Sequence, residues 1–188
     1  MACFQQFLTF RAPPRGGRGT LVSRADVRGA HARPGRRWHR NGLHLRVDIN
    51  DALAFARTTR QSVLTTIRRN GRPQLSNVMH QVGDDGIIRI SITADRAKYH
   101  NLVREPWAAL HVTRPDFFAY AVIEGDVTLS PVATAPDDPS VDELVSVYRA
   151  AVGEHDDWDE YRAAMVADRR VVVRIAPTHA YGMLPAPA

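Results

Sequence analysis

Apolar and polar residues alternate most clearly between positions 88 and 93. Ile88, Ile90 and Ile92 alternate with polar residues, which places the isoleucines on one face of a strand and the polar side chains on the other. Similar signals, bounded by turn residues, predict five further strands at residues 62–68, 74–82, 107–113, 117–129 and 170–175. The pattern therefore predicts six strands.

Two turns connect the first three strands. Asn70-Gly71 predicts a tight hairpin, because both residues tolerate the positive φ angles that a two-residue turn requires. Residues 83–86, Gly-Asp-Asp-Gly, predict a second turn directly before the strand of alternating isoleucines. Strands joined by such short turns are expected to be antiparallel.

Helical spacing of apolar residues predicts four short helices. The first begins at Asp48 or Asn50, and Asp95 is expected to be the N-cap of the second. The expected apolar stripe of the second helix is Tyr99, Leu102 and Val103. Ser140 and Glu143 have the spacing of a capping box for the third, which Gly153 is placed to end, and the fourth covers residues 157–167.

These elements favour a mainly β, α+β fold. Hairpin-linked strands dominate, and only residues 130–169 are mainly helical. This order favours a six-stranded antiparallel β-barrel with short helices over a doubly wound parallel sheet.

Charge divides the chain into a tail and a domain. Residues 1–42 contain nine arginines and one acidic residue, which leaves 16 basic and 19 acidic residues for 43–188. The tail is rich in Arg, Pro and Gly and is expected to be disordered. A single domain over 43–188 with a slight acidic excess does not favour nucleic-acid binding by the fold, although the tail itself leaves that reading open.

Cysteine and hydropathy narrow the class of protein further. Cys3 is the one cysteine, so neither an internal disulfide nor a cysteine-based metal site is expected. The histidines lack metal-ligand spacing, and the sequence has no apolar run long enough to span a membrane. We therefore expect a cytoplasmic protein without a metal and without a membrane partner.

The candidate chemistry lies after the alternating strand. Arg96 and Lys98 are predicted to lie in the first helical turn, where cations oppose the positive end of the helix dipole. A bound phosphate would reverse that cost, by accepting backbone N–H groups and pairing with both cations. Ser91 and Thr93, on the polar face of the strand, would add hydroxyl donors. The alternative is a pair of solvated surface cations.

Two motifs, taken in order, carry a family resemblance. Residues 66–78 read T-x-x-x-x-G-x-P-x-x-S-x-V, and residues 91–102 read S-x-T-x-x-R-x-K-x-x-N-L. Together with Tyr-Ala-Val-Ile-Glu-Gly at 120–125, they resemble the pyridoxamine 5'-phosphate oxidase-like FMN-binding split β-barrel superfamily. The resemblance covers roughly residues 45–182 and is strongest to its actinobacterial branch of coenzyme F-420-dependent oxidoreductases.

The resemblance implies a six-stranded split barrel that forms a homodimer, with two cofactor clefts between the subunits. It implies that the cofactor phosphate lies at Arg96 and Lys98, close to Ser91, Ile92 and Thr93. The residues it places along the isoalloxazine or deazaflavin ring are Pro73, Gln74, Ser76 and Asn77. Phe118 and Tyr120 are implied as wall residues, facing the partner's cleft, and Tyr120 or water is a candidate proton donor.

The implied activity is hydride transfer between coenzyme F-420 and a conjugated small-molecule substrate. An FMN-dependent oxidoreductase is the alternative within the same fold. A pyridoxamine 5'-phosphate oxidase-like enzyme belongs to the same alternative, but Arg-Ile-Ala-Pro at 174–177 matches the longer C-terminal segment of true pyridoxamine-phosphate oxidases only faintly, which argues against vitamin B6 oxidation. A non-catalytic carrier of flavin, haem or coenzyme is a further alternative, because the pocket residues are better defined than any catalytic group.

Overall fold

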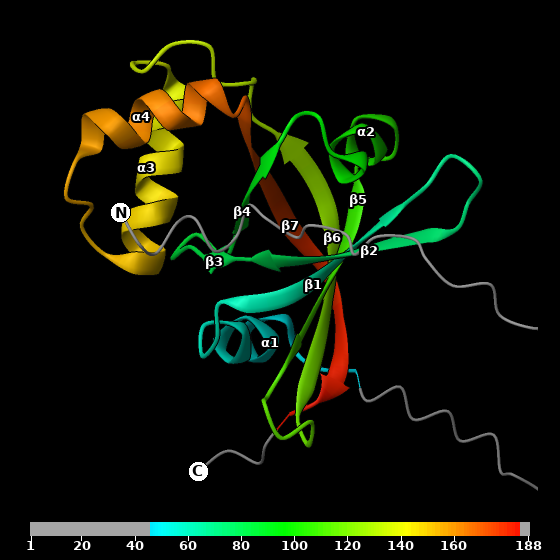
Figure 1. Cartoon of the computed structure of the whole chain (residues 1–188). Coiled ribbons are helices and arrows are strands. Elements are labelled where there is room, and N and C mark those ends of the chain that lie inside the picture. The colour runs from blue at the N-terminus through cyan, green and yellow to red at the C-terminus, as the bar shows by residue number, and fades with distance from the viewer. Residues whose placement is uncertain (1–45, 185–188) are drawn as a thin grey trace, which may run out of the picture. The chain divides into compact units, whose positions relative to one another are not determined.

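A computed structural model describes residues 46–184, so the predicted tail at 1–42 lies outside the described residues. The described range contains four helices and seven strands (Figure 1). The helices are α1 (Ile49–Ala56), α2 (Ala97–Arg104), α3 (Pro139–Val152) and α4 (Trp158–Ala167). The strands are β1 (Gln61–Ile67), β2 (Pro73–Met79), β3 (Gln81–Val82), β4 (Ile88–Thr93), β5 (Trp107–Thr113), β6 (Tyr120–Leu129) and β7 (Arg170–Met183).

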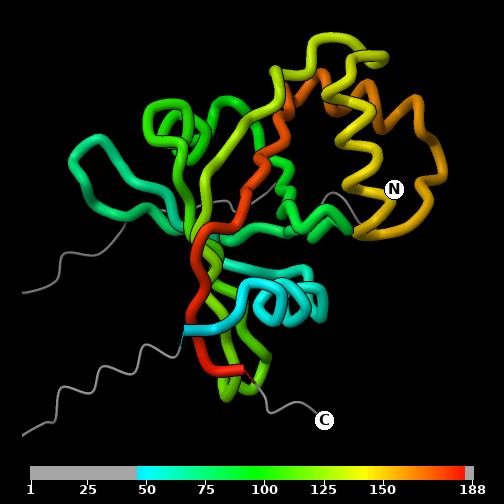
Figure 2. The backbone as a smooth tube through the Cα atoms, turned by 180° about the vertical axis from the view of Figure 1, so that it is seen from behind, coloured from blue at the N-terminus to red at the C-terminus, as the bar shows by residue number. Residues whose placement is uncertain are grey.

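The seven strands form one antiparallel sheet in the order β2-β1-β5-β6-β7-β4-β3. Strands β2 and β3 lie at opposite ends of this order, although only His80 separates them in the chain. In a flat sheet these two strands would be about 29 Å apart, six spacings of about 4.8 Å, which one residue cannot span. The sheet therefore curls until its ends approach, and Figure 2 shows the curled backbone from behind.

This architecture confirms the predicted antiparallel barrel with short helices. The strand number differs by one, because the predicted strand at 74–82 divides at His80 into β2 and β3. Counted as one bent strand that serves both ends of the sheet, β2 and β3 restore the predicted number of six.

His80 is buried at the point of division. Its Nε2 lies 3.0 Å from the carbonyl oxygen of Ala56, and its Nδ1 lies 3.0 Å from the hydroxyl of Ser62. Because a carbonyl oxygen only accepts, Nε2 carries the proton and Nδ1 accepts from Ser62. Burial lowers the pKa of His80, against hydrogen bonds with backbone groups of Ala56 and Arg60 that raise it. The ring therefore ties the end of α1 to β1 as a neutral group.

The core fills the inside of the curl. Ile88, Ile90 and Ile92 are all buried there, which confirms the alternation read from the sequence. They belong to one apolar cluster with Leu64 of β1 and Leu110 of β5. Each fully buried aliphatic side chain stabilises the fold by about 1.5–3 kcal/mol. Strand β4 is thereby fixed with its polar face outward.

The predicted cap of α1 is confirmed, whereas that of α2 is wrong. Asp48 accepts a hydrogen bond from the backbone N–H of Asn50 at 2.8 Å. Asp95 does not cap α2, because its carboxylate accepts from the hydroxyl of Thr93 at the end of β4. The helix consequently begins one residue later, with Arg96 at the N-cap position.

The predicted apolar stripe of α2 is only partly correct. Leu102 is buried and Tyr99 packs against the core, but the side chain of Val103 is 61% exposed. Successive helical residues are rotated by about 100°, so Leu102 and Val103 cannot both face the barrel from so short a helix.

The predicted capping box of α3 is also wrong. The helix begins at Pro139, whose fixed φ and missing N–H suit the first helical position. Asp138 is therefore the N-cap residue, and Ser140 lies within the first turn. Glu143 pairs with arginines of the sheet instead of the helix start. Gly153 ends the helix with φ 106°, as expected.

Strand β7 continues to Met183, well beyond the predicted end of the strand at residue 175. Pro177 suggests a strand end because it lacks a backbone donor, yet it pairs with Gly125 directly after a β-bulge at which Thr178 of β7 has no partner in β6. A Cβ atom at Gly125 would lie 2.3 Å from the carbonyl oxygen of Ala176. The close approach of the two strands at this point explains why residue 125 is a glycine. The irregular strand pairing there explains why the strand tolerates Pro177.

Helices α3 and α4 form a second layer beside the barrel. They enclose a separate apolar cluster that includes Leu144, Tyr161 and Met165 and reaches Val172 on the outer face of β7. Figures 1 and 2 both show these helices on the opposite side of the molecule from the β1–β2 hairpin. The region between the two, where β4 leads into α2, carries the predicted phosphate residues.

Candidate cofactor site

Three cations gather where β4 ends and α2 begins. Arg96 and Lys98 come from the start of α2, and Arg170 starts β7, directly opposite Thr93 in the β4–β7 register. We call Arg96, Lys98 and Arg170 the basic corner. The hydroxyl of Thr93 lies 3.4 Å from Nε of Arg96 and donates to Asp95. The structure thus brings the predicted residues Thr93, Arg96 and Lys98 together and adds Arg170.

The charges of the basic corner repel one another. The pKa of Lys98 is lowered, first by burial and then by Arg96, while Asp95 opposes the shift and Arg170 adds to it. Nε of Arg96 lies 3.6 Å from Oδ1 of Asp95, so the carboxylate of Asp95 partly screens the charge of Arg96. A bound anion would relieve the remaining repulsion and favour the charged form of Lys98. The donor set of the corner therefore fits a phosphate.

Sequence reasoning missed Arg170. Its Nε and Nη2 atoms both donate to Oδ2 of Asp168, at 3.2 and 2.9 Å. The pairing of β4 with β7, which places Arg170 opposite Thr93, is a long-range contact without a local sequence signal. The only local signal is an Asp-x-Arg pair ahead of the last strand, which is a common surface arrangement.

Ser91 and Ile92 lie on opposite faces of β4. Ile92 is buried in the core, so only its backbone is available to a ligand. Ser91 is half-buried on the face of Thr93, and its cross-strand neighbour is Val172, which packs under α3 and α4. Of the two predicted residues, Ser91 alone directs its side chain toward the face of the basic corner.

The four residues predicted along the cofactor ring divide between the two faces of β2. Gln74 and Ser76 lie on the half-buried face, where Nε2 of Gln74 donates to the hydroxyl of Ser76 at 2.7 Å. Pro73 and Asn77 lie on the exposed face. The alternation of a strand requires this division, so within one chain the structure does not place all four on one surface.

A polar network joins the β1–β2 hairpin to α2. The buried hydroxyl of Thr66 donates to Oε1 of Gln74 at 3.1 Å and accepts from Nδ2 of Asn101 at 3.0 Å. Asn101 follows Lys98 by three residues, so both lie on neighbouring positions of the α2 surface. The Thr and Asn of the two sequence motifs therefore hold the hairpin in register with the basic corner.

Phe118 and Tyr120 do not reach the basic corner of their own chain. Phe118 is 76% exposed in the loop between β5 and β6, and Tyr120 starts β6 with its ring 5.8 Å from that of His111. Figures 1 and 2 both show this loop at the opposite end of the barrel from α2. Phe118 and Tyr120 could therefore contact a cofactor at the basic corner only from a second chain.

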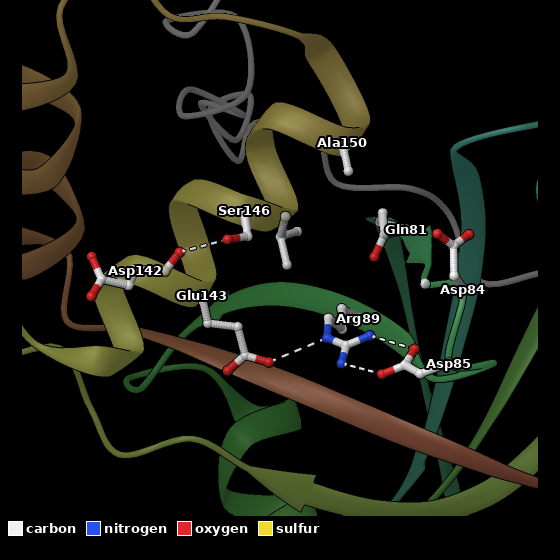
Figure 3. A pocket seen from close by; sticks show the side chains of 10 residues that line it. Gln81, Asp84, Asp85, Arg89, Asp142, Glu143, Ser146 and Ala150 are labelled. Atoms are coloured by element: carbon white, nitrogen blue, oxygen red, sulfur yellow. Dashed lines mark hydrogen bonds and ion pairs between the residues drawn. The ribbon is translucent and has the colours of Figure 1, made fainter.

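A pocket of about 520 Å³ lies between α3 and the β3–β4 turn (Figure 3). None of its ten lining residues belongs to the predicted cofactor site. Arg89 crosses its floor and donates to Asp85 at 2.6 Å and to Glu143 at 3.3 Å. Because Arg89 and Thr93 lie at opposite ends of β4, the pocket is separate from the basic corner.

The described residues contain neither a metal site nor a membrane-spanning helix. Among residues 46–184, no group of three or more His, Cys, Asp or Glu side chains is arranged to hold a metal ion. No helix in the same range is long and apolar enough to cross a membrane.

The family of the chain follows from a match to a known sequence model. The model described as Pyridoxamine 5'-phosphate oxidase (PNPOx_N) matches residues 50–184. The chain therefore belongs to the pyridoxamine 5'-phosphate oxidase-like family of flavin-binding split barrels, whose members are in general oxidoreductases. This result confirms the resemblance carried by the two motifs.

Solved structures share the fold. A conserved hypothetical protein from Mycobacterium tuberculosis is 21% identical with a TM-score of 0.57, over 76% of this chain and 91% of the other. An F420 reductase is 25% identical with a TM-score of 0.53, over 68% and 93%. A heme binding protein from Mycobacterium smegmatis is 14% identical with a TM-score of 0.55, over 74% and 55%.

Proposed function

We propose that this protein is an oxidoreductase that binds coenzyme F-420 through its phosphate and transfers a hydride between it and a conjugated small molecule. The observation that carries the proposal is the basic corner, in which Arg96 and Lys98 concentrate positive charge at the start of α2. The likeness to an F420 reductase, at 25% identity, supports the choice of coenzyme.

The residues of the chain would hold and orient the coenzyme. When bound, the deazaflavin ring supplies two electrons together as a hydride. Arg96 offers a planar fork of donors to phosphate oxygens, Lys98 a compact charge, and Thr93 a hydroxyl. Gln74 and Ser76, held toward α2 by the polar network, would follow the edge of the ring.

A second copy of the chain would complete the site. Leu75 on the exposed face of β2 is 62% exposed, and Met79 on the same face is also exposed. Phe118, at the far end of the barrel, can approach a basic corner only across a dimer interface. The proposed homodimer covers these apolar side chains and brings Phe118 and Tyr120 to the partner's cofactor, where Tyr120 is the candidate proton donor.

FMN is the alternative cofactor. The family is flavin-binding, and the phosphate of FMN would make the same contacts with Arg96 and Lys98. A non-catalytic carrier is the second alternative, because Tyr120 is the single candidate for proton transfer. The cytoplasmic location inferred from the lone Cys3 belongs to the same proposal.

The test is a binding titration of the purified chain with F-420 and, separately, with FMN. We expect F-420 to bind more tightly, and Lys98→Ala to weaken it by about tenfold or more, because a charge-assisted contact to phosphate is lost. Arg149→Ala is the matched control. Arg149 lies on α3 and its guanidinium pairs with Glu154 just beyond the helix, so its removal changes net charge equally and should leave affinity unchanged.

The outcomes separate the three readings. Tighter binding of FMN would favour the flavin alternative. Binding of reduced F-420 without turnover of enones, quinones or unsaturated lactones would favour the carrier. A chain that binds neither compound, or a Lys98→Ala variant that binds F-420 as well as the original protein, would contradict the proposal.

A further inference from the structure

We propose that Arg170 is a third ligand of the cofactor phosphate and that Asp168 positions its guanidinium for this role. The proposal rests on the proposed function and extends the site to the last strand of the chain. Neither sequence motif contains Arg170, and its position in the fold brings it to the phosphate residues.

The sheet register places Arg170 at the corner. Arg170 is the direct cross-strand neighbour of Thr93, so their side chains leave the same face of the sheet at adjacent positions. The hydroxyl of Thr93 also lies 3.4 Å from Nε of Arg96, so Thr93 has Arg96 as a hydrogen-bond partner and Arg170 as its cross-strand neighbour. The turn before β7 is fixed to β4, because the carbonyl oxygen of Arg169 accepts from the backbone N–H of Ala94 at 3.1 Å.

Arg170 is held more firmly than Arg96. The side chain of Arg170 is 17% exposed, compared with 59% for Arg96. Two hydrogen bonds to one oxygen of Asp168 fix its plane. Among the described residues the hydrogen bonds of Arg170 come from Nε and Nη2, so the two N–H groups of Nη1 make none there. The charge of Arg170 also acts on Tyr161 of α4, where it opposes the rise in pKa that burial causes. A planar group fixed in advance loses little entropy when it binds phosphate.

The electrostatics point the same way. Arg170 and Arg96 both disfavour the charge on Lys98, with Asp95 opposing them. Asp95 and Asp168 offset part of the charge of the three cations, and an anion bound among them would offset the remainder. A purely structural role, in which Arg170 serves only its pair with Asp168, would not require the pair to lie beside Lys98.

The test compares ligands with and without the phosphate, for the original chain and for Arg170→Gln. FMN and riboflavin differ in the phosphate alone. F-420 and its deazaflavin alcohol form the second pair, which differs in the phosphate together with the polyglutamate tail attached to it. We expect the phosphate-bearing compound to bind more tightly to the original chain, and Arg170→Gln to reduce that advantage by about tenfold. Affinity for the phosphate-free compound should be unchanged, which also reports that the variant site is folded.

Arg174→Gln is the matched control. Arg174 lies on the same face of β7, four residues further on, and pairs with Glu143 much as Arg170 pairs with Asp168. It should keep the full phosphate advantage. The role of Arg170 is refuted if Arg170→Gln also keeps the full phosphate advantage. It is refuted as well if the variant loses affinity equally for the phosphate-bearing and the phosphate-free compound. If the original chain binds none of the four compounds, the proposed function fails and this inference fails with it.

Discussion

His80 is a titratable side chain in the position of a core residue. It is buried, neutral and bonded on both ring nitrogens, between α1 and β1. Its pKa in the folded chain is lowered below 6.5, chiefly by burial. As the pH falls below 6.5, the unfolded chain takes up a proton that the folded chain resists, so the free energy of unfolding decreases. At higher pH both states are neutral and this penalty is absent.

The prediction concerns the variant His80→Gln, which cannot titrate. The free energy of unfolding of the original chain should exceed that of the variant at pH 8, and the difference should shrink toward pH 5, by at most about 1.4 kcal/mol per pH unit. Urea denaturation at several pH values measures this. His100→Gln, which removes an exposed histidine, is the control. Parallel pH profiles for the original chain and His80→Gln would contradict the assignment.

The place of a single residue could be predicted where it depends only on the neighbouring sequence. Arg96 and Lys98 stand out because cations are unfavourable at a helix start, and the structure places Arg96 at the N-cap of α2 beside Thr93 and Lys98 in the first turn. The position of Arg170 beside these residues was not predictable, because it depends on the register of two strands that are far apart in the sequence. Phe118 was read as a wall residue from family resemblance alone, and within one chain it lies away from the corner.

Among the elements, α3 is attached to the sheet through one carboxylate. Glu143 accepts a hydrogen bond from Arg89 of β4 at 3.3 Å and another from Arg174 of β7 at 2.7 Å. The three side chains are largely shielded from solvent. Figure 3 shows Glu143 and Arg89 meeting across the pocket. The helical layer is therefore joined to two strands at the end of β4 opposite the basic corner.

Glu143→Gln should lower the free energy of unfolding by about 1–3 kcal/mol, because two guanidinium groups lose a charged acceptor. Affinity for the cofactor should be unchanged. Thermal or urea unfolding measures the first effect and the binding titration the second. Glu154→Gln is the control, since its pair with Arg149 is exposed and should contribute much less. Equal stability of the two variants would show that the contact with the sheet is unimportant.

Elements followed from the sequence where one periodicity dominated. The alternation over 88–93 was predicted correctly because β4 buries a single face, and the bounds of β5 were also predicted correctly, although Ala109 is buried on the second face of that strand. The division of β2 from β3 was not, since it results from closure of the sheet and not from a break in the pattern. The start of α3 was misplaced because Pro139 defines the first turn more strongly than a capping box does.

At the scale of the whole molecule, the exposed face of β2 predicts self-association. The original chain should sediment as a dimer at micromolar concentration, and Leu75→Glu should shift it toward the monomer by burying a charge in the interface. The affinity for F-420 should fall as the dimer dissociates, because Phe118 and Tyr120 of the second chain no longer contact the cofactor.

Val152→Glu provides the control for this experiment. Val152 is 54% exposed at the end of α3, away from β2, so the variant carries the same new charge without touching the proposed interface. It should stay dimeric and retain its affinity for F-420. A monomeric original chain, or a Leu75→Glu variant that stays dimeric, would contradict the proposal.

Strand β7, the last of the sheet in the chain, lies between β6 and β4 in the strand order. Until it is synthesised, the nascent polypeptide can form only two separate pieces, β2-β1-β5-β6 and β4-β3, each with an open edge. Open edges favour pairing with other chains. The barrel therefore closes only after β7 has been synthesised, and an incomplete product released before that point would be prone to aggregation.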